Sequence, residues 1–149
     1  MRYHTACHLI SNVLYKHTNA KITGNQIELD KTRIDFSMKD YSPKKLNQFV
    51  EEANKIIEND LPVRIDYMSR EKVLRNPELA RLAKGLPKAI KNLRIIKIGN
   101  IDEQVDGGTH VNHLKEIGKI EIIKTANKGK NNRRMYFIIK KSEMRYPLI

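Results

Sequence analysis

The sequence of residues 42–57, SPKKLNQFVEEANKII, gives the clearest secondary-structure signal of the chain. Ser42 suits a helix N-cap, and Pro43 suits the first helical position, where its missing N–H leaves no hydrogen bond unmade. The apolar side chains that follow recur at helical spacing and form a single stripe, which consists of Leu46, Phe49, Val50, Ala53, Ile56 and Ile57. We therefore predict an amphipathic helix that ends near Asn59-Asp60 and packs its stripe against a core.

Alternating apolar and polar residues predict strands on both sides of this helix. Before it, residues 27–29 and 32–36 flank Asp30-Lys31 and predict a hairpin, and Thr23-Gly24-Asn25 predicts a turn. After it, strands are predicted at residues 62–68, 93–98, 117–123 and 133–140, with a polar hairpin loop at 127–132.

The remaining helical signals are an opening helix over residues 4–16, a short helix capped by Ser69 that runs through residue 74, and a helical turn or two within residues 77–92. The acidic segment 101–105 leads into a turn at 106–110. This order predicts an α+β fold with a mainly antiparallel sheet flanked by helices, and 149 residues suit one domain over residues 1–149.

Lysine and arginine outnumber aspartate and glutamate by 29 to 17, which gives a formal net charge of +12 at pH 7. The excess lies in two blocks, residues 70–97 and 119–149, each with nine basic and two acidic side chains, whereas residues 98–118 have one basic and four acidic side chains. Such a surface attracts a polyanion, because each Lys or Arg that meets a phosphate releases condensed counterions. A solubilising coat is the alternative, and the blockwise distribution favours nucleic acid.

The composition also limits the location of the protein and the kind of metal site. No run approaches about 18 consecutive apolar residues, and the opening Met-Arg-Tyr-His-Thr lacks the apolar segment of a secretory signal, so we expect a cytoplasmic protein without a membrane partner. A single cysteine, Cys7, excludes a disulfide within the chain and a four-thiolate zinc site. Any metal ion must be held mainly by histidine and carboxylate.

His4 and His8 are spaced so that both imidazoles lie on one face of a helix and can share a cation. Zinc proteases of the HExxH type use this spacing, but they place a glutamate after the first histidine as the base, where this chain has Thr5. Such a protease is therefore disfavoured. Taken alone, the pair is better interpreted as two histidines that share a surface helix by chance.

Asp106-Gly107-Gly108-Thr109-His110 supplies a carboxylate and an imidazole across two glycines that permit a tight turn. The two side chains could complete a His3Asp set with His4 and His8, since zinc accepts histidine nitrogen at roughly 2.0–2.1 Å and carboxylate oxygen at roughly 2.0–2.2 Å. The alternative is a Gly-Gly hairpin turn in which Asp106 caps backbone N–H groups. Spacing alone does not choose between the two.

Five short motifs occur in one order along nearly the whole chain: residues 4–9 (HTACHL), 33–37 (RIDFS), 106–111 (DGGTHV), 116–118 (EIG) and the basic stretch 128–134. In this order and at these separations the set resembles the AlaX family, free-standing editing proteins related to the editing domain of alanyl-tRNA synthetase. Each motif alone is weak, but the ordered set is specific. The related editing domain of threonyl-tRNA synthetase usually has Arg-Gly-Pro-His where this chain has Gly-Gly-Thr-His, which favours the alanine side.

The resemblance implies a threonyl/alanyl-tRNA synthetase editing-domain-like fold and an ATP-independent aminoacyl-tRNA deacylase that contributes to translation fidelity. The expected reaction is hydrolysis of the ester between alanine tRNA and a wrongly attached amino acid, serine first and glycine as a second candidate. The family's zinc ligands correspond to His4, His8 and His110, so the expected cofactor is Zn²⁺ and the expected partner is mischarged alanine tRNA, with no obligatory protein partner.

The chain departs from the family at Asp106, where the family usually has cysteine, and at Leu114-Lys115, where it often has Thr-Gly. Aspartate keeps the charge of a thiolate and could be the fourth ligand, with metal affinity and preference left open. Cys7 is no obvious substitute, because it lies about 60° and about 100° around the helix from His4 and His8. We expect it to be a small, partly buried residue.

Since an aminoacyl ester is already activated, positioning a water and stabilising the oxyanion can suffice for its hydrolysis. The backbone around Gly107, Gly108 and Thr109 is the candidate for oxyanion and substrate contacts. Thr23 is the candidate for a hydrogen bond to the serine hydroxyl, which alanine lacks, and an ordinary turn residue is the alternative.

The basic stretch near the last hairpin supplies candidate phosphate contacts, Lys128, Lys130, Arg133 and Arg134, and a second group, Arg81, Lys84, Lys88 and Lys91, could lengthen the track. Solvated charge is the alternative for each of them. The competing function is a non-catalytic tRNA- or RNA-binding module in which Asp106 marks a degraded metal site. A hydrolase of another small ester suits the charge less well.

Overall fold

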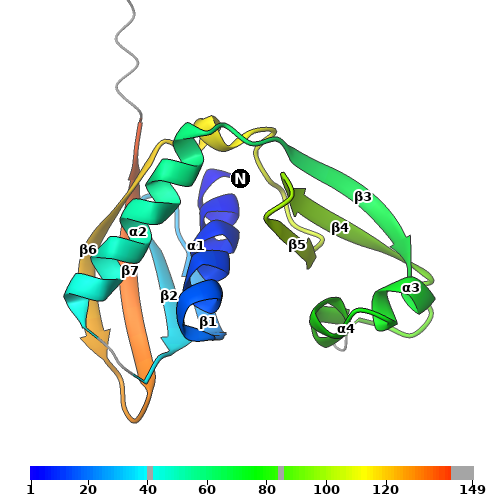
Figure 1. Cartoon of the computed structure of the whole chain (residues 1–149), viewed down its shortest axis with the longest axis horizontal. Coiled ribbons are helices and arrows are strands. Elements are labelled where there is room, and N and C mark those ends of the chain that lie inside the picture. The colour runs from blue at the N-terminus through cyan, green and yellow to red at the C-terminus, as the bar shows by residue number, and fades with distance from the viewer. Residues whose placement is uncertain (40–41, 84–85, 142–149) are drawn as a thin grey trace, which may run out of the picture.

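The computed structural model describes residues 1–39, 42–83 and 86–141 (Figure 1). Every strand pair in the described part of the chain is antiparallel, and helices flank the strands, so the predicted α+β class is confirmed. In chain order the elements are α1 (Arg2–Thr18), β1 (Ile22–Ile27), β2 (Thr32–Ser37), α2 (Pro43–Glu58), β3 (Val63–Ser69), α3 (Arg70–Leu74), α4 (Pro77–Ala83), β4 (Asn92–Ile98), β5 (Asp102–Val105), the 3-10 helix η1 (Leu114–Glu116), β6 (Lys119–Asn127) and β7 (Asn132–Lys140).

The first sheet contains four strands in the order β1-β2-β7-β6. Figure 1 shows α1 and α2 together on one face of this sheet. The helices bury their apolar stripes against the phenylalanines of the two central strands, Phe36 and Phe137, both of which are fully buried. This packing fixes α1, whose N-terminal half carries the histidine pair, over the main core.

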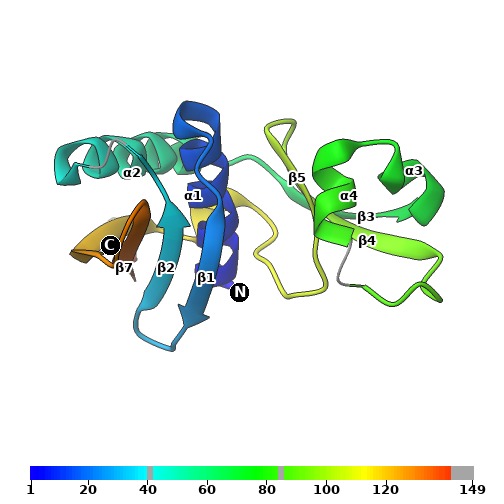
Figure 2. The ribbon, with the colours of Figure 1, turned by 90° about the horizontal axis from the view of Figure 1, so that it is seen from below.

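The second sheet contains three strands in the order β3-β4-β5. The short helices α3 and α4 cover one of its faces, where Val73 and Leu79 pack with Leu93 and Ile95 in a separate cluster. Figure 2 shows this sheet and its helices beside the first sheet, with the β5 end next to α1. The prediction of one mainly antiparallel sheet is thus refined into two sheets.

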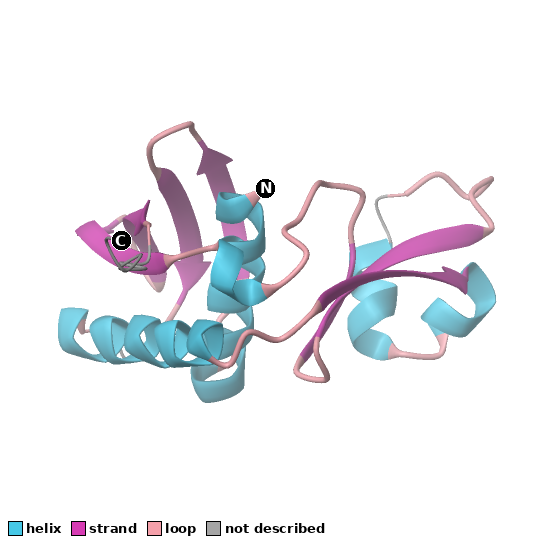
Figure 3. Cartoon of the chain, turned by 90° about the horizontal axis from the view of Figure 1, so that it is seen from above, coloured by secondary structure: helices cyan, strands magenta, loops and turns pink. Residues whose placement is uncertain are grey.

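Two chain crossings join the two parts. Val63 N donates a hydrogen bond to Asn112 O (2.8 Å), and Leu114 N donates one to Leu61 O (3.0 Å), so the segment that enters β3 and the segment that follows the 106–110 turn run side by side. Figure 3 shows the loop after β5 running back from the second sheet toward α1. The turn predicted from Gly107-Gly108 therefore lies at the junction of the two parts.

Most predicted elements are present with small changes of boundary. The Ser42 side chain accepts a hydrogen bond from Lys45 N (3.1 Å), which confirms the predicted N-cap of α2. The turn predicted at Thr23-Gly24-Asn25 is wrong, because these residues lie within β1, whose register with β2 shifts between Ile22 and Gly24. β5 was not expected, since its sequence Asp-Glu-Gln-Val has no apolar alternation.

Among the described residues, none of the helices combines the length and the apolar character that a bilayer-spanning segment requires.

Candidate metal centre and adjoining cleft

Helix α1 presents His4 and His8 one turn apart, as the spacing predicted, with side chains 26% and 10% exposed. The start of the helix is anchored by Arg2, whose Nε and Nη2 donate hydrogen bonds to Ile117 O at 3.0 and 2.7 Å. Because the apolar side chains of α1 are buried in the main core, the helix has little freedom to rotate the histidines away.

The turn at residues 106–110 is fastened to β4 by Arg94. Its Nη1 donates hydrogen bonds to Asp106 O (3.0 Å) and Gly108 O (2.7 Å), and its carbonyl accepts one from Asp106 N (3.1 Å). Gly108 must be a glycine here, because a Cβ at this position would overlap the ring of His4. The sequence analysis missed Arg94, since an arginine inside a basic block carries no signal that separates it from its neighbours.

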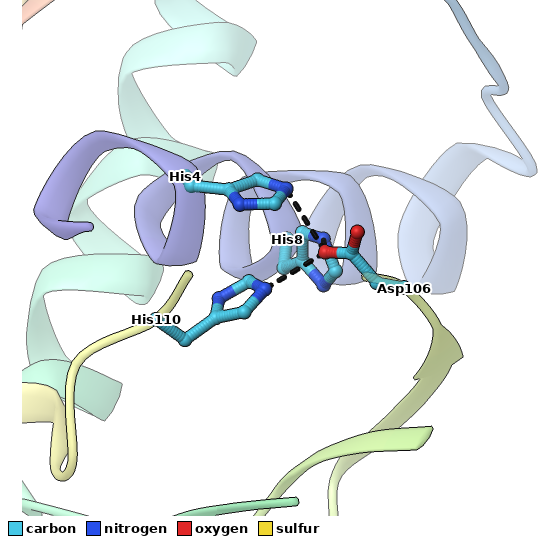
Figure 4. Close-up of side chains that lie close together, drawn as sticks. All are labelled: His4, His8, Asp106 and His110. Atoms are coloured by element: carbon cyan, nitrogen blue, oxygen red, sulfur yellow. Dashed lines mark hydrogen bonds and ion pairs between the residues drawn. The ribbon is translucent and has the colours of Figure 1, made fainter. Parts of the chain in front are cut away.

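The four side chains converge on one point. Nε2 of His4, His8 and His110 lie 2.9, 2.9 and 2.8 Å from Oδ2 of Asp106 (Figure 4). Asp106 Oδ1 accepts a hydrogen bond from Gly108 N (3.0 Å). One carboxylate oxygen therefore caps the turn, as the second interpretation predicts, and the other one faces three imidazoles, which is the arrangement that the metal interpretation requires.

In two of the three rings, a hydrogen bond at Nδ1 determines which ring nitrogen carries the proton, and therefore whether Nε2 can donate to Asp106. His4 Nδ1 lies 3.2 Å from Thr109 O, which can only accept, so this nitrogen carries the proton. His110 Nδ1 lies 2.9 Å from Thr5 Oγ1, which donates to Met1 O and accepts from Val111 N, so this nitrogen also acts as the donor. In a neutral ring each Nε2 then directs a lone pair at the Asp106 carboxylate, and a cation among the four atoms removes that repulsion.

The electrostatics of the cluster are dominated by Asp106. Burial opposes ionisation of this carboxyl, but contacts with His110, His4, His8 and the Gly108 N–H outweigh it and hold its pKa far below the usual range. The hydrogen bond with Asp106 raises the pKa of His4, whereas burial lowers the pKa of His110. The carboxylate is thus ionised at every physiological pH, as a metal ligand must be.

The donor set fits a metal ion. One ligand atom from each of His4, His8, Asp106 and His110 can be chosen so that all four lie within 4.8 Å of one another. Tetrahedral zinc with ligands at about 2.0–2.1 Å separates them by about 3.3 Å, so the carboxylate oxygen would have to retreat by about half an ångström. Three imidazoles and one carboxylate are ligands that zinc accepts.

A cleft of about 420 Å³ adjoins the cluster and is lined by His4 and His8, by further polar residues of α1, by β1 and by the start of β5. Within it, Asn12 and Gln104 donate hydrogen bonds to the carboxylate of Asp102, whose pKa is raised by burial. Asp102 is the main site residue that the sequence analysis missed. The acidic segment between two basic blocks was the signal that could have directed attention to it.

The structure does not bring Thr23 together with the cleft, and its contact with a serine hydroxyl stays a prediction. The side chain is exposed in β1, its hydroxyl lies 3.4 Å from Asn132 Oδ1, and it is not among the residues that line the cleft. The shift of register that turns Thr23 outward brings Ile22 and Asn25 of the same strand to the cleft instead.

The backbone of the turn is only partly available for substrate contacts. The N–H of Gly108 is engaged by Asp106 Oδ1, so the prediction of an oxyanion donor is wrong for this group. The carbonyl of Thr109 faces His4 Nδ1, and a Cβ added at Gly107 would meet no atom of the described residues within 4 Å. Gly107 and Thr109 stay as predicted candidates for N–H contacts.

Cys7 is 8% exposed, and burial raises the pKa of its thiol to about 12. Cys7 is not among the four residues whose ligand atoms converge.

The predicted phosphate contacts of the last hairpin differ in their surroundings. Lys128 and Lys130 are exposed at the loop, whereas Arg134 forms a paired contact with Asp35 (2.8 and 3.2 Å) and Arg133 binds Met38 O and the side chain of Asn127. In the second predicted group, Lys88 and Lys91 are exposed, and the Arg81 side chain and Lys84 lie outside the described residues.

The sequence is similar to proteins of known name over most of its length. Residues 93–136, which include Asp106 and His110, match the model of the family described as Threonyl and Alanyl tRNA synthetase second additional domain. The alanyl-tRNA editing protein AlaX-M of Methanosarcina barkeri is 43% identical over 140 residues, which cover 93% of this chain and 58% of that protein. AlaX-M of Saccharolobus solfataricus is 39% identical over 140 residues, covering 94% and 58%.

A more distant similarity extends to a synthetase, the alanine–tRNA ligase of Streptococcus mutans, which is 30% identical over 146 residues, or 95% of this chain and 16% of the ligase. The chain spans somewhat more than half the length of the AlaX-M proteins that it matches. These similarities confirm the resemblance inferred from the motifs: the chain is similar to the AlaX alanyl-tRNA editing proteins over most of its length, and residues 93–136 match the model of the second additional domain of threonyl- and alanyl-tRNA synthetases.

Proposed function

We propose that this chain is a trans-editing deacylase that hydrolyses the aminoacyl ester of mischarged alanine tRNA, seryl first and glycyl second, at a zinc site formed by His4, His8, Asp106 and His110. The observation that carries the proposal is the convergence of three imidazole nitrogens and one carboxylate oxygen beside a cleft that can admit an amino-acid ester. Similarity to proteins named alanyl-tRNA editing proteins supports the choice of substrate.

When bound, the metal ion would supply a Lewis acid that polarises the ester carbonyl, in addition to its contacts with the four protein ligands. The chain itself supplies the geometry. Asp106 holds its turn in shape through Gly108 N, and Arg94 fastens that turn to β4, so the ester has a fixed surface to bind against. For an activated ester, fixed positioning of the reacting groups accounts for a large part of the rate of hydrolysis, because it replaces a bimolecular encounter by a step within one complex.

A site that distinguishes serine from alanine needs a polar group that hydrogen-bonds the serine hydroxyl. When alanine binds instead, this polar group is left unpaired, and alanine is strongly disfavoured. The cleft provides such groups in Ser11 and Asn25, which line it, whereas Thr23 does not.

The basic surface serves the tRNA. Lys128 and Lys130 extend from the β6–β7 hairpin without an ion pair in the described residues, so they are free to contact phosphates. Residues 1–149 act in this proposal as one editing domain, in the cytoplasm, with tRNA as the partner and no obligatory protein partner.

The test combines metal content with selectivity. Protein purified without chelator is expected to contain about one zinc per chain and to release serine from seryl-tRNA of the alanine system faster than alanine from alanyl-tRNA. Hydrolysis of neither ester, together with tight tRNA binding and no zinc, would show the competing function, a binding module with a degraded metal site. Hydrolysis of simple esters without preference for tRNA would show a hydrolase of another class.

A further inference from the structure

The carboxylate of Asp102 faces the cleft from the second sheet. Asp102 pairs with Ile98 of β4, and Ile98 is buried in the main core, so the side chains at this end of β5 are directed toward α1. Asn12 of α1 confirms this direction, because its Nδ2 donates hydrogen bonds both to Ile101 O (2.9 Å) and to Asp102 Oδ1 (3.2 Å). Asp102 and the histidine pair thus line one cleft from opposite sides of the junction.

Neutral amide groups hold this carboxylate, one on each oxygen. Asn12 Nδ2 contacts Oδ1, and Gln104 Nε2 contacts Oδ2 at 2.9 Å. No lysine or arginine of the described residues forms an ion pair with it, although the chain has a net charge of +12. The backbone N–H of Glu103 is a third donor to this carboxylate, which leaves one of its four acceptor positions open. The carboxylate is thus oriented, but no lysine or arginine of the described residues neutralises its charge.

His8, which lines the same cleft, has a polar atom without a partner. Its side chain is 10% exposed, and its Nδ1 is buried without a hydrogen bond to any described residue. A buried polar atom of this kind is uncommon in a folded protein.

The chemistry of an aminoacyl ester suits this arrangement. Its α-ammonium group is a cation one carbon away from the ester carbonyl, and a partly buried ammonium is stable only when a carboxylate or several acceptors face it. N-acylated esters have the same carbonyl but no such charge. A carboxylate across the cleft from His4 and His8 therefore distinguishes the two classes.

We propose that Asp102 binds the α-ammonium group of the aminoacyl ester, so that the cleft accepts esters with a free amino group and directs their carbonyl toward His4 and His8. This inference rests on the proposed function, because it concerns the substrate of the same site. Asp102 is a binding residue here, and Asn12 and Gln104 are positioning residues that orient its two oxygens.

The experiment measures binding with two stable probes, 3′-deoxy-3′-(L-serylamino)adenosine and its N-acetyl counterpart, by isothermal titration calorimetry. The change is Asp102→Asn, which keeps the shape and removes the charge, and Gln104 can rotate its amide to accept from the new amide group. The matched control is Asp66→Asn, the same change on an exposed aspartate of β3. Circular dichroism and thermal melting establish that each variant is folded.

We expect Asp102→Asn to weaken binding of the free-amine probe by about tenfold or more, as expected for the loss of a charge-assisted hydrogen bond, and to leave the N-acetyl probe unchanged within about twofold. The control should bind both probes like the original chain. If Asp102→Asn unfolds, Asn12→Ala offers a milder change, for which the same selective loss is expected at smaller size.

The outcomes separate this inference from the proposed function. If the original chain deacylates seryl-tRNA and folded Asp102→Asn binds both probes equally well, the ammonium assignment is wrong and the editing function stands. If the original chain binds the free-amine probe no better than the N-acetyl probe, the assignment is overturned as well. If it binds the free-amine probe selectively but deacylates no tRNA, the subsite stands and the proposed reaction fails.

Discussion

At the scale of single residues, Asp106 is the group on which the candidate metal centre depends. One of its oxygens faces the Nε2 atoms of three histidines, and the other one is the acceptor that shapes the turn. Aspartate reaches less far and is a harder ligand than the cysteine that the AlaX motif usually has here, so in the proposed site this position should influence metal affinity and preference. The aspartate keeps the charge of a thiolate.

Asp106→Ala should reduce zinc affinity by at least about 100-fold, since changes in outer-shell partners alone cost about 10–100-fold. Asp106→Cys should keep or raise the affinity, because a thiolate carries the same charge and is a softer ligand. Zinc content by mass spectrometry and competition with a chromogenic chelator measure both, with the exposed Asp66→Ala as the control. Unchanged zinc content in Asp106→Ala would remove Asp106 from the ligand set.

The two adjacent glycines of the turn give a sharper comparison. A Cβ at residue 108 would overlap the His4 ring, whereas a Cβ at residue 107 has no atom within 4 Å. Gly108→Ala should therefore displace His4, lower zinc affinity and destabilise the fold by about 1–3 kcal/mol, as overpacking does. Gly107→Ala should stay within about 0.5 kcal/mol of the original chain in urea unfolding. Equal behaviour of the two variants would contradict the close approach of the turn to α1.

The sequence indicates the four candidate ligands but not the residues that hold them in place. The helical spacing of His4 and His8 and the glycines between Asp106 and His110 are local signals. The residues without a local signal are Thr5, Arg94 and Asp102. They act through contacts with residues at least 12 positions away or through burial against another element. A local sequence pattern does not indicate such contacts. The position of Thr23 outside the cleft likewise depends on a non-local feature, the shift of register between β1 and β2.

At the scale of elements, local signals are most reliable where a cap and a periodic stripe agree. α2 has both, and its predicted start and end are confirmed. β5 has neither: its four residues are held by pairing with β4, so the strand depends on tertiary structure rather than on its own sequence. The threonine-glycine-asparagine turn signal in β1 was overridden by pairing with β2 for the same reason.

The pairing of β2 with β7 includes an ion pair that should make stability depend on pH. The hydrogen bonds from Arg134 hold the pKa of Asp35 below its usual range, so the folded state binds a proton less readily than the unfolded chain. The stabilisation is complete above the unfolded pKa of about 3.9 and is lost as the pH falls through the lower folded value.

Asp35→Asn should consequently be less stable than the original chain at pH 7, and the difference should shrink toward pH 3. Urea unfolding at both pH values measures it. Glu28→Gln is the control, since Glu28 and its partner Lys31 are exposed and 3.9 Å apart, and it should show little effect at either pH. A difference for Asp35→Asn that is the same at pH 7 and pH 3 would show that the ion pair contributes nothing through its charge.

At the scale of the whole molecule, the metal ligands and the cleft lie at the junction of two sheets. α1 belongs to the first core, and the Asp106 turn is fastened to the second sheet through Arg94, so the candidate site forms only when both parts are folded together. The excess positive charge lies outside this junction, in the blocks before and after the acidic segment. An acidic junction between basic blocks suits a substrate with a polyanionic body and a cationic aminoacyl end.

Binding of uncharged alanine tRNA should then weaken with salt in proportion to the number of lysines that contact phosphates. Lys128→Ala combined with Lys130→Ala removes two exposed charges of the β6–β7 hairpin and should lower the slope of log affinity against log salt by about 2 if both contact phosphates. Lys44→Ala combined with Lys55→Ala, exposed positions on α2, is the control with the same change of net charge. Filter binding between low and moderate salt measures the slopes. An equal decrease in both double variants would mean that the tRNA responds to net charge alone, and no decrease in either would move the contact surface to another part of the chain.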